Sequence, residues 1–251
     1  MARKNDKDNR RMNTKNLGTV YGCWSQIPID KLHPDSIIYS FGAGEDICFE
    51  FMLSGLTDSE IHIFDPTPRA VEHFSYCTKI IKENMTYENN SRFGGGDPKY
   101  LSYIKDSNVS LAKLFFHDYG LYDEDSSFEF FYPKNKEHVS LSIDNLQGTQ
   151  ESILLDVKKI DTIMSDLGHN HIDVLKLNIE GAEVKSLLHM LKNTNIRPTY
   201  ISVKFELARD GLKNNFNLIN ELEQRLSESY SLIFVDRERF NYTLISKDIN
   251  K

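Results

Sequence analysis

A glycine turn followed by two acids is the part of this sequence best suited to hold a cofactor. Three β-forming residues lead into Gly42-Ala43-Gly44, and Glu45 and Asp46 follow at once. A second apolar run ends in Asp65, about 20 residues further on. Glycines let the backbone approach a ligand without a Cβ in the way, and an acid at the next strand tip can bind both hydroxyls of a ribose. The order strand, glycine turn, helix, strand, acid therefore predicts a site for a nucleoside-bearing cofactor.

The residues after the turn discriminate between cofactors. A dinucleotide-binding turn usually reads G-x-G-x-x-G, whereas here Glu45, Asp46 and Ile47 follow Gly44 with no third glycine. Two carboxylates lie where a pyrophosphate needs bare amide groups, so they would repel it. S-adenosyl-L-methionine, which has a positive sulfonium and an amino acid moiety, suits the turn better. The turn alone does not separate a cofactor site from an ordinary tight turn, where G-x-G also occurs.

Two residues are candidates for a general base. If such a sulfonium cofactor gives its methyl group to an alcohol, the reaction is an in-line displacement that also needs a group to take the hydroxyl proton. His138 lies in a polar segment, where it can reach a bound acceptor or be a plain surface histidine. Glu180 follows an apolar strand and can act as the base or cap the next helix. Glu183 fits the first turn of that helix better than it fits catalysis.

A mainly parallel sheet is needed to bring these residues together. Apolar runs alternate with helix-forming segments, which predicts such a sheet with helices on both faces. Ligands bind these sheets beyond the carboxyl ends of the strands. Strands are expected at residues 37–41, 60–64, 112–117, 153–157, 171–177 and 198–205, with an antiparallel pair, 231–235 and 240–245, at the edge and a hairpin arm at 127–132. Segments 42–46, 65, 118–120 and 178–180 should then converge on one crevice.

The domain organisation is expected to be simple. Residues 17–251 should form a single domain, since the length fits one large α/β unit. Residues 1–16 are polar and lack an apolar stretch, which predicts a disordered arm and no secretory signal. The run Gly94-Gly95-Gly96-Asp97-Pro98 predicts a surface loop or an insertion over residues 86–108.

Composition argues against several classes of protein. A formal net charge of −7 over 251 residues disfavours a nucleic-acid-binding surface. No apolar run approaches the ~20 residues that span a bilayer. Cys23, Cys48 and Cys77 form neither a metal-ligand pair nor an even disulfide set, which predicts reduced thiols in a cytoplasmic protein. No H-x-x-x-H spacing or clustered carboxylates predict a metal site.

Six blocks of sequence resemble the FkbM-type family of S-adenosylmethionine-dependent methyltransferases. They are YSFGAGEDICFE, FDPTPRAVE, FHDYGLYDED, FYPKNKEHVS, DNLQGTQES and IDVLKLNIEGAE, within a span from about Tyr21 to Phe205. The resemblance implies an α/β, Rossmann-like class I methyltransferase fold, with a mainly parallel seven-stranded sheet, helices on both faces and an antiparallel final strand. It also implies methyl transfer, commonly to a hydroxyl of a sugar or a natural product.

The resemblance further implies where the cofactor binds. The methionine side would be lined by Phe41, Gly42, Ala43, Gly44, Glu45 and Asp46. Asp65 would bind the ribose, Pro66 and Thr67 would border the adenosine, and the adenine would be flanked by the segment 117–120, which contains Asp118, Tyr119 and Gly120.

Two positions depart from the family pattern. Asn178 stands where the family usually has Asp, so a carbonyl acceptor is kept and a charge is lost. Val203-Lys204-Phe205-Glu206 replaces a common V-E-F-H, which predicts a different acceptor pocket.

Two other functions remain open at this point. A nicotinamide-dependent oxidoreductase would share the strand and turn pattern, although the missing third glycine speaks against it. A binding protein that has lost catalysis would be consistent with Asn178. The expected partner is a small-molecule or glycan hydroxyl acceptor, and the oligomeric state is left open. Trp24 is expected in the core and Arg69 on a helix surface.

Overall fold

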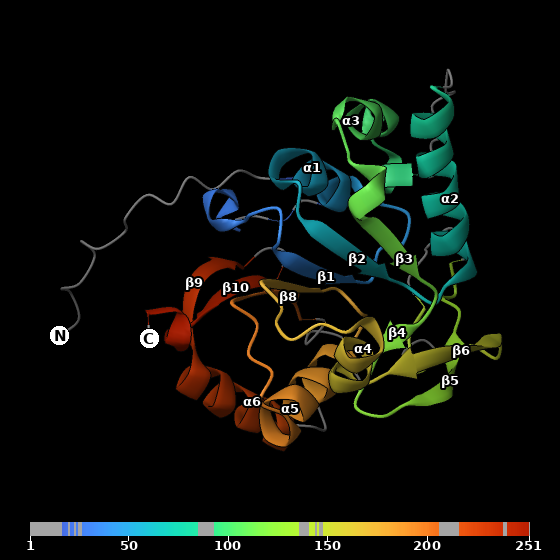
Figure 1. Ribbon diagram of the computed structural model, residues 1–251. Helices are drawn as coiled ribbons and strands as arrows, with labels where there is room; N and C mark the ends of the chain where they lie inside the picture. Colours follow the sequence, from blue (N-terminus) through green and yellow to red (C-terminus); the bar gives the residue numbers. More distant parts are fainter. Residues whose placement is uncertain are drawn as a thin grey trace.

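A central sheet of seven strands organises the protein (Figure 1). The computed structural model describes residues 17–19, 21–22, 24, 27–84, 93–135, 141–143, 145, 148–205, 216–237 and 240–250. The sheet has the order β3-β2-β1-β7-β8-β10-β9. Its strands are β1 (Ile37–Phe41), β2 (Glu60–Phe64), β3 (Leu114–His117), β7 (Val174–Leu177), β8 (Tyr200–Lys204), β9 (Tyr230–Asp236) and β10 (Asn241–Ser246).

The pairing of the strands confirms the predicted fold class. β1 pairs in parallel with β2 and β7, and parallel pairs also join β2 to β3 and β7 to β8. The final strand, β10, lies between β8 and β9 and is antiparallel to both. The strand order reverses between β1 and β7, so the ligand crevice of such a sheet is expected beyond their carboxyl ends.

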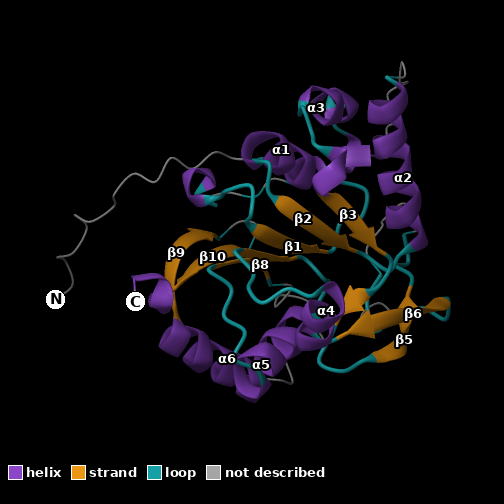
Figure 2. Cartoon of the chain, in the orientation of Figure 1, coloured by secondary structure: helices purple, strands orange, loops and turns teal. Residues whose placement is uncertain are grey.

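Helices cover both faces of the sheet (Figure 2). One face carries α1 (Cys48–Thr57), α2 (Pro68–Glu83) and α3 (Tyr100–Asp106), and the other carries α4 (Ile160–Leu167), α5 (Glu183–Asn193) and α6 (Phe216–Ser229). Alternating side chains of a strand point to opposite faces. In β1, Ile38 therefore packs in the core beneath α1, whereas Tyr39 and Phe41 pack in the core on the opposite face. Within the described part of the chain, no helix is long and apolar enough to cross a membrane.

A second, smaller sheet stands beside the main one. It has the order β4-β6-β5, with β4 (Gly120–Leu121), β5 (Ser126–Phe131) and β6 (Ser152–Lys158). β5 and β6 pair antiparallel, which confirms the predicted hairpin arm. The two-residue strand β4 was not predicted, because so short a segment has no readable alternation.

The glycine-rich segment contains more regular secondary structure than its sequence suggests. The expectation for residues 86–108 was a surface loop or an insertion; where the structure describes this segment, a 3₁₀ turn, Phe93–Gly96, and helix α3 occupy it, so it is not a plain loop, and the insertion stays a prediction. Tyr100 on α3 is buried, and its hydroxyl accepts a hydrogen bond from the Ile47 amide at 3.0 Å. Burial of α3 against α1 and α2 thus overrides the local glycine signal. Among the described residues, the other 3₁₀ turns are Ile29–Lys31, Leu111–Lys113 and Lys247–Asn250. Residues 1–16 lie outside the described residues.

Candidate functional site

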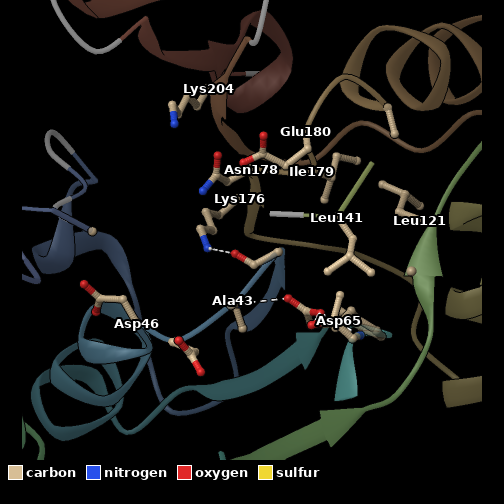
Figure 3. A pocket seen from close by; sticks show the side chains of 18 of the residues that line it. Ala43, Asp46, Asp65, Leu121, Leu141, Lys176, Asn178, Ile179, Glu180 and Lys204 are labelled. Atoms are coloured by element: carbon tan, nitrogen blue, oxygen red, sulfur yellow. Dashed lines mark hydrogen bonds between the residues drawn. The ribbon is translucent and has the colours of Figure 1, made fainter. Parts of the chain in front are cut away.

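A pocket of about 470 Å³ lies at the carboxyl ends of β1, β2 and β7. Its volume is typical of small-molecule sites, which occupy roughly 300–1,000 Å³. The structure brings most of the predicted site residues into its lining: Gly42, Ala43, Gly44, Glu45, Asp46, Asp65, Pro66, Thr67, Gly120, Asn178 and Glu180. Figure 3 shows Asn178, Glu180 and Lys204 on one side of the pocket and Asp46 and Asp65 on the other.

Three predicted residues that the structure describes are not brought into this lining. Phe41 is fully buried and stacks on Phe64 with a centroid distance of 4.3 Å, because the last strand residue points into the core. Tyr119 packs against Phe64 and His117. Asp118 lines a separate hollow beside the start of α2. His138 lies outside the described residues.

The glycine turn is shaped by the close approach of β7. Gly42 has a φ of +79°, and a Cβ there would lie 1.9 Å from the carbonyl oxygen of Asn178. Only glycine fits at this point, since the obstacle is backbone and cannot move aside. The turn therefore depends on its glycine for the packing of β1 against β7 as well as for any ligand.

Asp65 anchors the same turn from the tip of β2. Its Oδ2 accepts a hydrogen bond from the Gly44 amide at 2.8 Å, and its Oδ1 accepts from the Thr67 amide at 2.9 Å and the Thr67 hydroxyl at 2.6 Å. A carboxylate can accept about four hydrogen bonds. Asp65 consequently uses most of its hydrogen-bond acceptor positions to hold the turn. About one position remains for a ligand hydroxyl.

Glu45 is neutralised by a residue that was expected to be an ordinary surface charge. Arg69 on α2 donates from Nε to Glu45 Oε1 at 3.1 Å and from Nη2 to Oε2 at 2.7 Å. The Glu45 side chain is only 4% exposed, so this two-point pair replaces much of its lost hydration. The surface role predicted for Arg69 is wrong, and the repulsion of a pyrophosphate cannot be ascribed to Glu45.

Asp46 is held by the segment that precedes the first strand. Thr19 donates its hydroxyl to Asp46 Oδ2, and the Cys48 amide donates to Oδ1 at 3.1 Å. Leu17 and Trp24 pair through their backbones, which folds the segment over the pocket. Burial raises the pKa of Asp46 to about 6. This carboxyl group thus changes charge near neutral pH.

A buried lysine at the centre of the pocket was missed in the sequence. Lys176 on β7 donates from Nζ to the carbonyl oxygen of Gly42 at 3.1 Å and to Glu50 Oε1 at 3.2 Å, and it lies 5.3 Å from the centre of the Trp24 ring. Both charged side chains are at most 3% exposed. The available signal was a lysine inside an otherwise apolar strand. Trp24 is buried as expected and also lines the pocket.

The turn after β7 directs Glu180 into the pocket. Glu183 accepts hydrogen bonds from the amides of Ile179 at 2.8 Å and Gly181 at 2.9 Å, so Glu183 is the acid that caps the turn. Its predicted place in the first helical turn is confirmed, and burial raises its pKa to about 7. Glu180 has a φ of +54°, a left-handed conformation that costs a non-glycine residue roughly 1–2 kcal/mol. Backbone strain of this kind concentrates at functional sites.

Comparison with known proteins identifies the family. Residues 42–231 match the family described as the Methyltransferase FkbM domain. The chain belongs to this family. No curated protein sequence matches it.

Three solved structures that are similar to this FkbM-family chain are distant from it in sequence. One is the methyltransferase FkbM from Methylobacillus flagellatus KT, at 12% identity and a TM-score of 0.46, covering 86% of this chain and 44% of that one. A second is the fibrillarin pre-rRNA processing protein of Methanococcus jannaschii, at 11% identity and 0.40, covering 88% and 70%. A third is an rRNA methylase from Streptococcus thermophilus, at 7% identity and 0.39, covering 87% and 90%. The chain thus spans less than half the length of the Methylobacillus protein.

Three buried oxygens in the pocket of this FkbM-family protein have no hydrogen-bond donor. Within the described part of the chain, Glu50 Oε2, Asn178 Oδ1 and Asn241 Oδ1 are buried without a partner, and all three residues line the pocket. Each such acceptor costs roughly 1–3 kcal/mol while it stays unsatisfied. The pocket therefore suits a ligand that brings hydrogen-bond donors, such as an ammonium group or hydroxyls. Asn241 was not predicted, because its approach to the pocket depends on the insertion of β10 into the sheet.

Proposed function

We propose that this chain is an S-adenosylmethionine-dependent methyltransferase that methylates a hydroxyl group of a sugar, a polysaccharide or a natural product. The observation that supports the cofactor best is the buried, unsatisfied Asn178 Oδ1 beside the Gly42 turn. An amide oxygen accepts hydrogen bonds from an ammonium group, and the amino acid part of this cofactor has one. Membership of the FkbM methyltransferase family supports the same chemistry.

The residues of the pocket fit the parts of this cofactor. When bound, S-adenosylmethionine supplies an electrophilic methyl group. Asn178 and the glycine turn would hold the amino acid end, with Asp46 as a nearby negative charge. The capacity left on Asp65 suits a ribose hydroxyl, since its Oδ2 accepts only one hydrogen bond among the described residues. Pro66 and Thr67 would border the adenosine.

The acceptor is proposed to bind on the opposite side of the pocket. Lys204 on β8 and Asn241 on β10 are direct partners in the antiparallel pair, and both line the pocket beside Glu180. Asn241 Oδ1 needs a donor, and a hydroxyl group can supply one. Glu180 would take the proton of the acceptor hydroxyl, which typically contributes about 10²–10⁴-fold to the rate. His138 stays a second candidate for this role.

The charge distribution disfavours a nicotinamide dinucleotide. Arg69 compensates Glu45 and Lys176 compensates Glu50, whereas no ion pair among the described residues involves Asp46 or Asp65. Two uncompensated carboxylates would repel a pyrophosphate, and unsatisfied acceptors cannot bind its oxygens. A cationic cofactor meets neither obstacle.

Titration calorimetry with S-adenosylmethionine, S-adenosylhomocysteine, NAD and NADP tests the cofactor. We expect both adenosylated compounds to bind and neither dinucleotide to do so; tighter binding of a dinucleotide would refute the proposal. Incubation with a methyl-labelled donor and a panel of hydroxylated acceptors, read by mass spectrometry, then tests the transfer. Cofactor binding without transfer to any acceptor would favour a protein that keeps the fold and has lost catalysis.

The proposed location is the cytoplasm. Cys48 and Cys77 are both free and buried, and reduced thiols are the rule in that compartment.

A further inference from the structure

A cluster of histidines and one glutamate lies away from the methyltransferase pocket. Glu60 and His62 are two residues apart on β2 and therefore share one face of the sheet, and His169 follows the end of α4. Each offers one ligand atom, and these atoms all lie within 4.8 Å of one another. None of the three residues lines the pocket described above. The cluster thus constitutes a separate candidate site.

The Glu60 carboxylate lies close to a nitrogen of each of the two histidines. Glu60 Oε1 lies 2.7 Å from His62 Nε2 and 3.2 Å from His169 Nε2. In a tetrahedral zinc site with bonds of about 2.0–2.1 Å, neighbouring ligand atoms are about 3.3 Å apart. To admit an ion, the Glu60 carboxylate must therefore move away from His62 by about 0.6 Å, and the two histidine Nε2 atoms, which lie within 4.8 Å of each other, must settle at about 3.3 Å. Its side chain is 38% exposed, so it has room to move and leaves a path for entry.

Neighbouring side chains hold the two imidazole rings in place. The second nitrogen of His169, Nδ1, lies 2.7 Å from the Tyr39 hydroxyl, and the Nδ1 of His62 lies 2.9 Å from His117 Nε2. Histidines that bind metals almost always donate a hydrogen bond from their other ring nitrogen. Here the Tyr39 oxygen and the His117 nitrogen are placed to accept those two bonds. Both Nε2 atoms are then left as ligands facing Glu60.

We propose that Glu60, His62 and His169 bind one divalent transition-metal ion, of which zinc is the best match. Two imidazoles and one carboxylate are a ligand set common to zinc sites, with the fourth position open to water on the exposed side of Glu60. The ion would fasten β2 to the segment between α4 and β7. Its role is structural, because none of its ligands reaches the pocket.

Zinc binding to the full chain tests the proposal. The chain is freed of metal with a chelator and then titrated with zinc chloride by calorimetry and thermal unfolding. We expect one zinc ion per chain and a rise in the unfolding temperature. Glu60→Gln and His169→Ala should each weaken affinity at least tenfold, and Tyr39→Phe should weaken it about 10- to 100-fold. Circular dichroism confirms that each variant folds, and Glu60→Gln keeps the size of a partly exposed side chain.

His189→Ala is the matched control. His189 is 11% exposed, as is His169, and it also contacts a carboxylate, with Nε2 2.8 Å from Asp161 Oδ1. This variant should keep the affinity and stoichiometry of the original chain. Absence of a stoichiometric zinc site, or equal affinity in His169→Ala and His189→Ala, would overturn the proposal.

Discussion

Replacement of Asn178 by leucine should stabilise the free protein and weaken cofactor binding together. Asn178 Oδ1 is buried and has no donor among the described residues, a defect that costs roughly 1–3 kcal/mol. Leucine has a similar size and removes the defect. For a domain of this length 1 kcal/mol corresponds to about 2–4 °C, so the unfolding temperature should rise by roughly 2–12 °C. If the cofactor satisfies Asn178, the affinity should fall by the same free energy, or about 5- to 140-fold.

The two effects are measured by differential scanning fluorimetry without ligand and by calorimetry with S-adenosylmethionine. Asn170→Leu is the control, because Asn170 is exposed and its Oδ1 contacts only the adjacent His171 ring. Asn170→Leu should change neither the unfolding temperature nor the affinity for S-adenosylmethionine appreciably. An Asn178→Leu variant that is less stable than the original chain and binds the cofactor equally well would refute the reasoning, since Asn178 would then have a structural role only.

The pocket leads to five further predictions. Glu180→Gln should lower the methyl-transfer rate about 10²–10⁴-fold with cofactor affinity within about twofold, measured by single-turnover kinetics and calorimetry; equal losses would indicate a binding role. Asp65→Asn should weaken cofactor binding by roughly 1–3 kcal/mol in the same calorimetry, because the amide group brings a donor where only acceptors are useful. Asn241→Leu should raise the KM for the acceptor and leave the Kd of the cofactor unchanged, since Asn241 is the strand partner of Lys204, which lies across the pocket from Asp65 in Figure 3. Because burial raises the pKa of Asp46 to about 6, affinity for a cationic cofactor should increase between pH 5 and 7, and Asp46→Asn should abolish this increase. The folded chain also holds this proton more tightly than the unfolded chain, so the contribution of Asp46 to stability should decline as the pH rises from about 4 to 6, measured as the difference in thermal unfolding between the original chain and Asp46→Asn.

The core of the fold could be predicted from the sequence because the patterns that define its strands and helices are local. The bounds of β1 and β2 match the expected strands residue for residue, since both are unbroken β-forming runs between turn residues. Pro68 marks the start of α2 because proline suits a first helical turn. The helix α3 was missed because its position depends on buried Tyr100, and no local pattern reports which residues will cover that ring.

The candidate site could be predicted only in part, because some of its contacts join residues that are far apart in the sequence. The glycine turn and Asp65 follow directly from the ends of strands, where ligands of parallel sheets bind. The ion pair between Glu45 and Arg69 joins two residues that are 24 positions apart. Local sequence patterns therefore could not predict that Arg69 neutralises the charge of Glu45 in the turn. Lys176 looked like one more residue of an apolar strand until the structure placed Glu50 beside it.

The unsatisfied acceptors support the proposal that two ligands bind in this pocket. Three of them together cost roughly 3–9 kcal/mol, a large share of the 5–15 kcal/mol by which proteins of this kind are stable. Such a cost is consistent with a role in binding and not with a role in folding. Asn178 belongs to the end of β7, whereas Asn241 belongs to β10, at the far side of β8 in the sheet. These two asparagine oxygens need two separate donors, and the proposed ammonium-bearing cofactor and hydroxylated acceptor would supply one each.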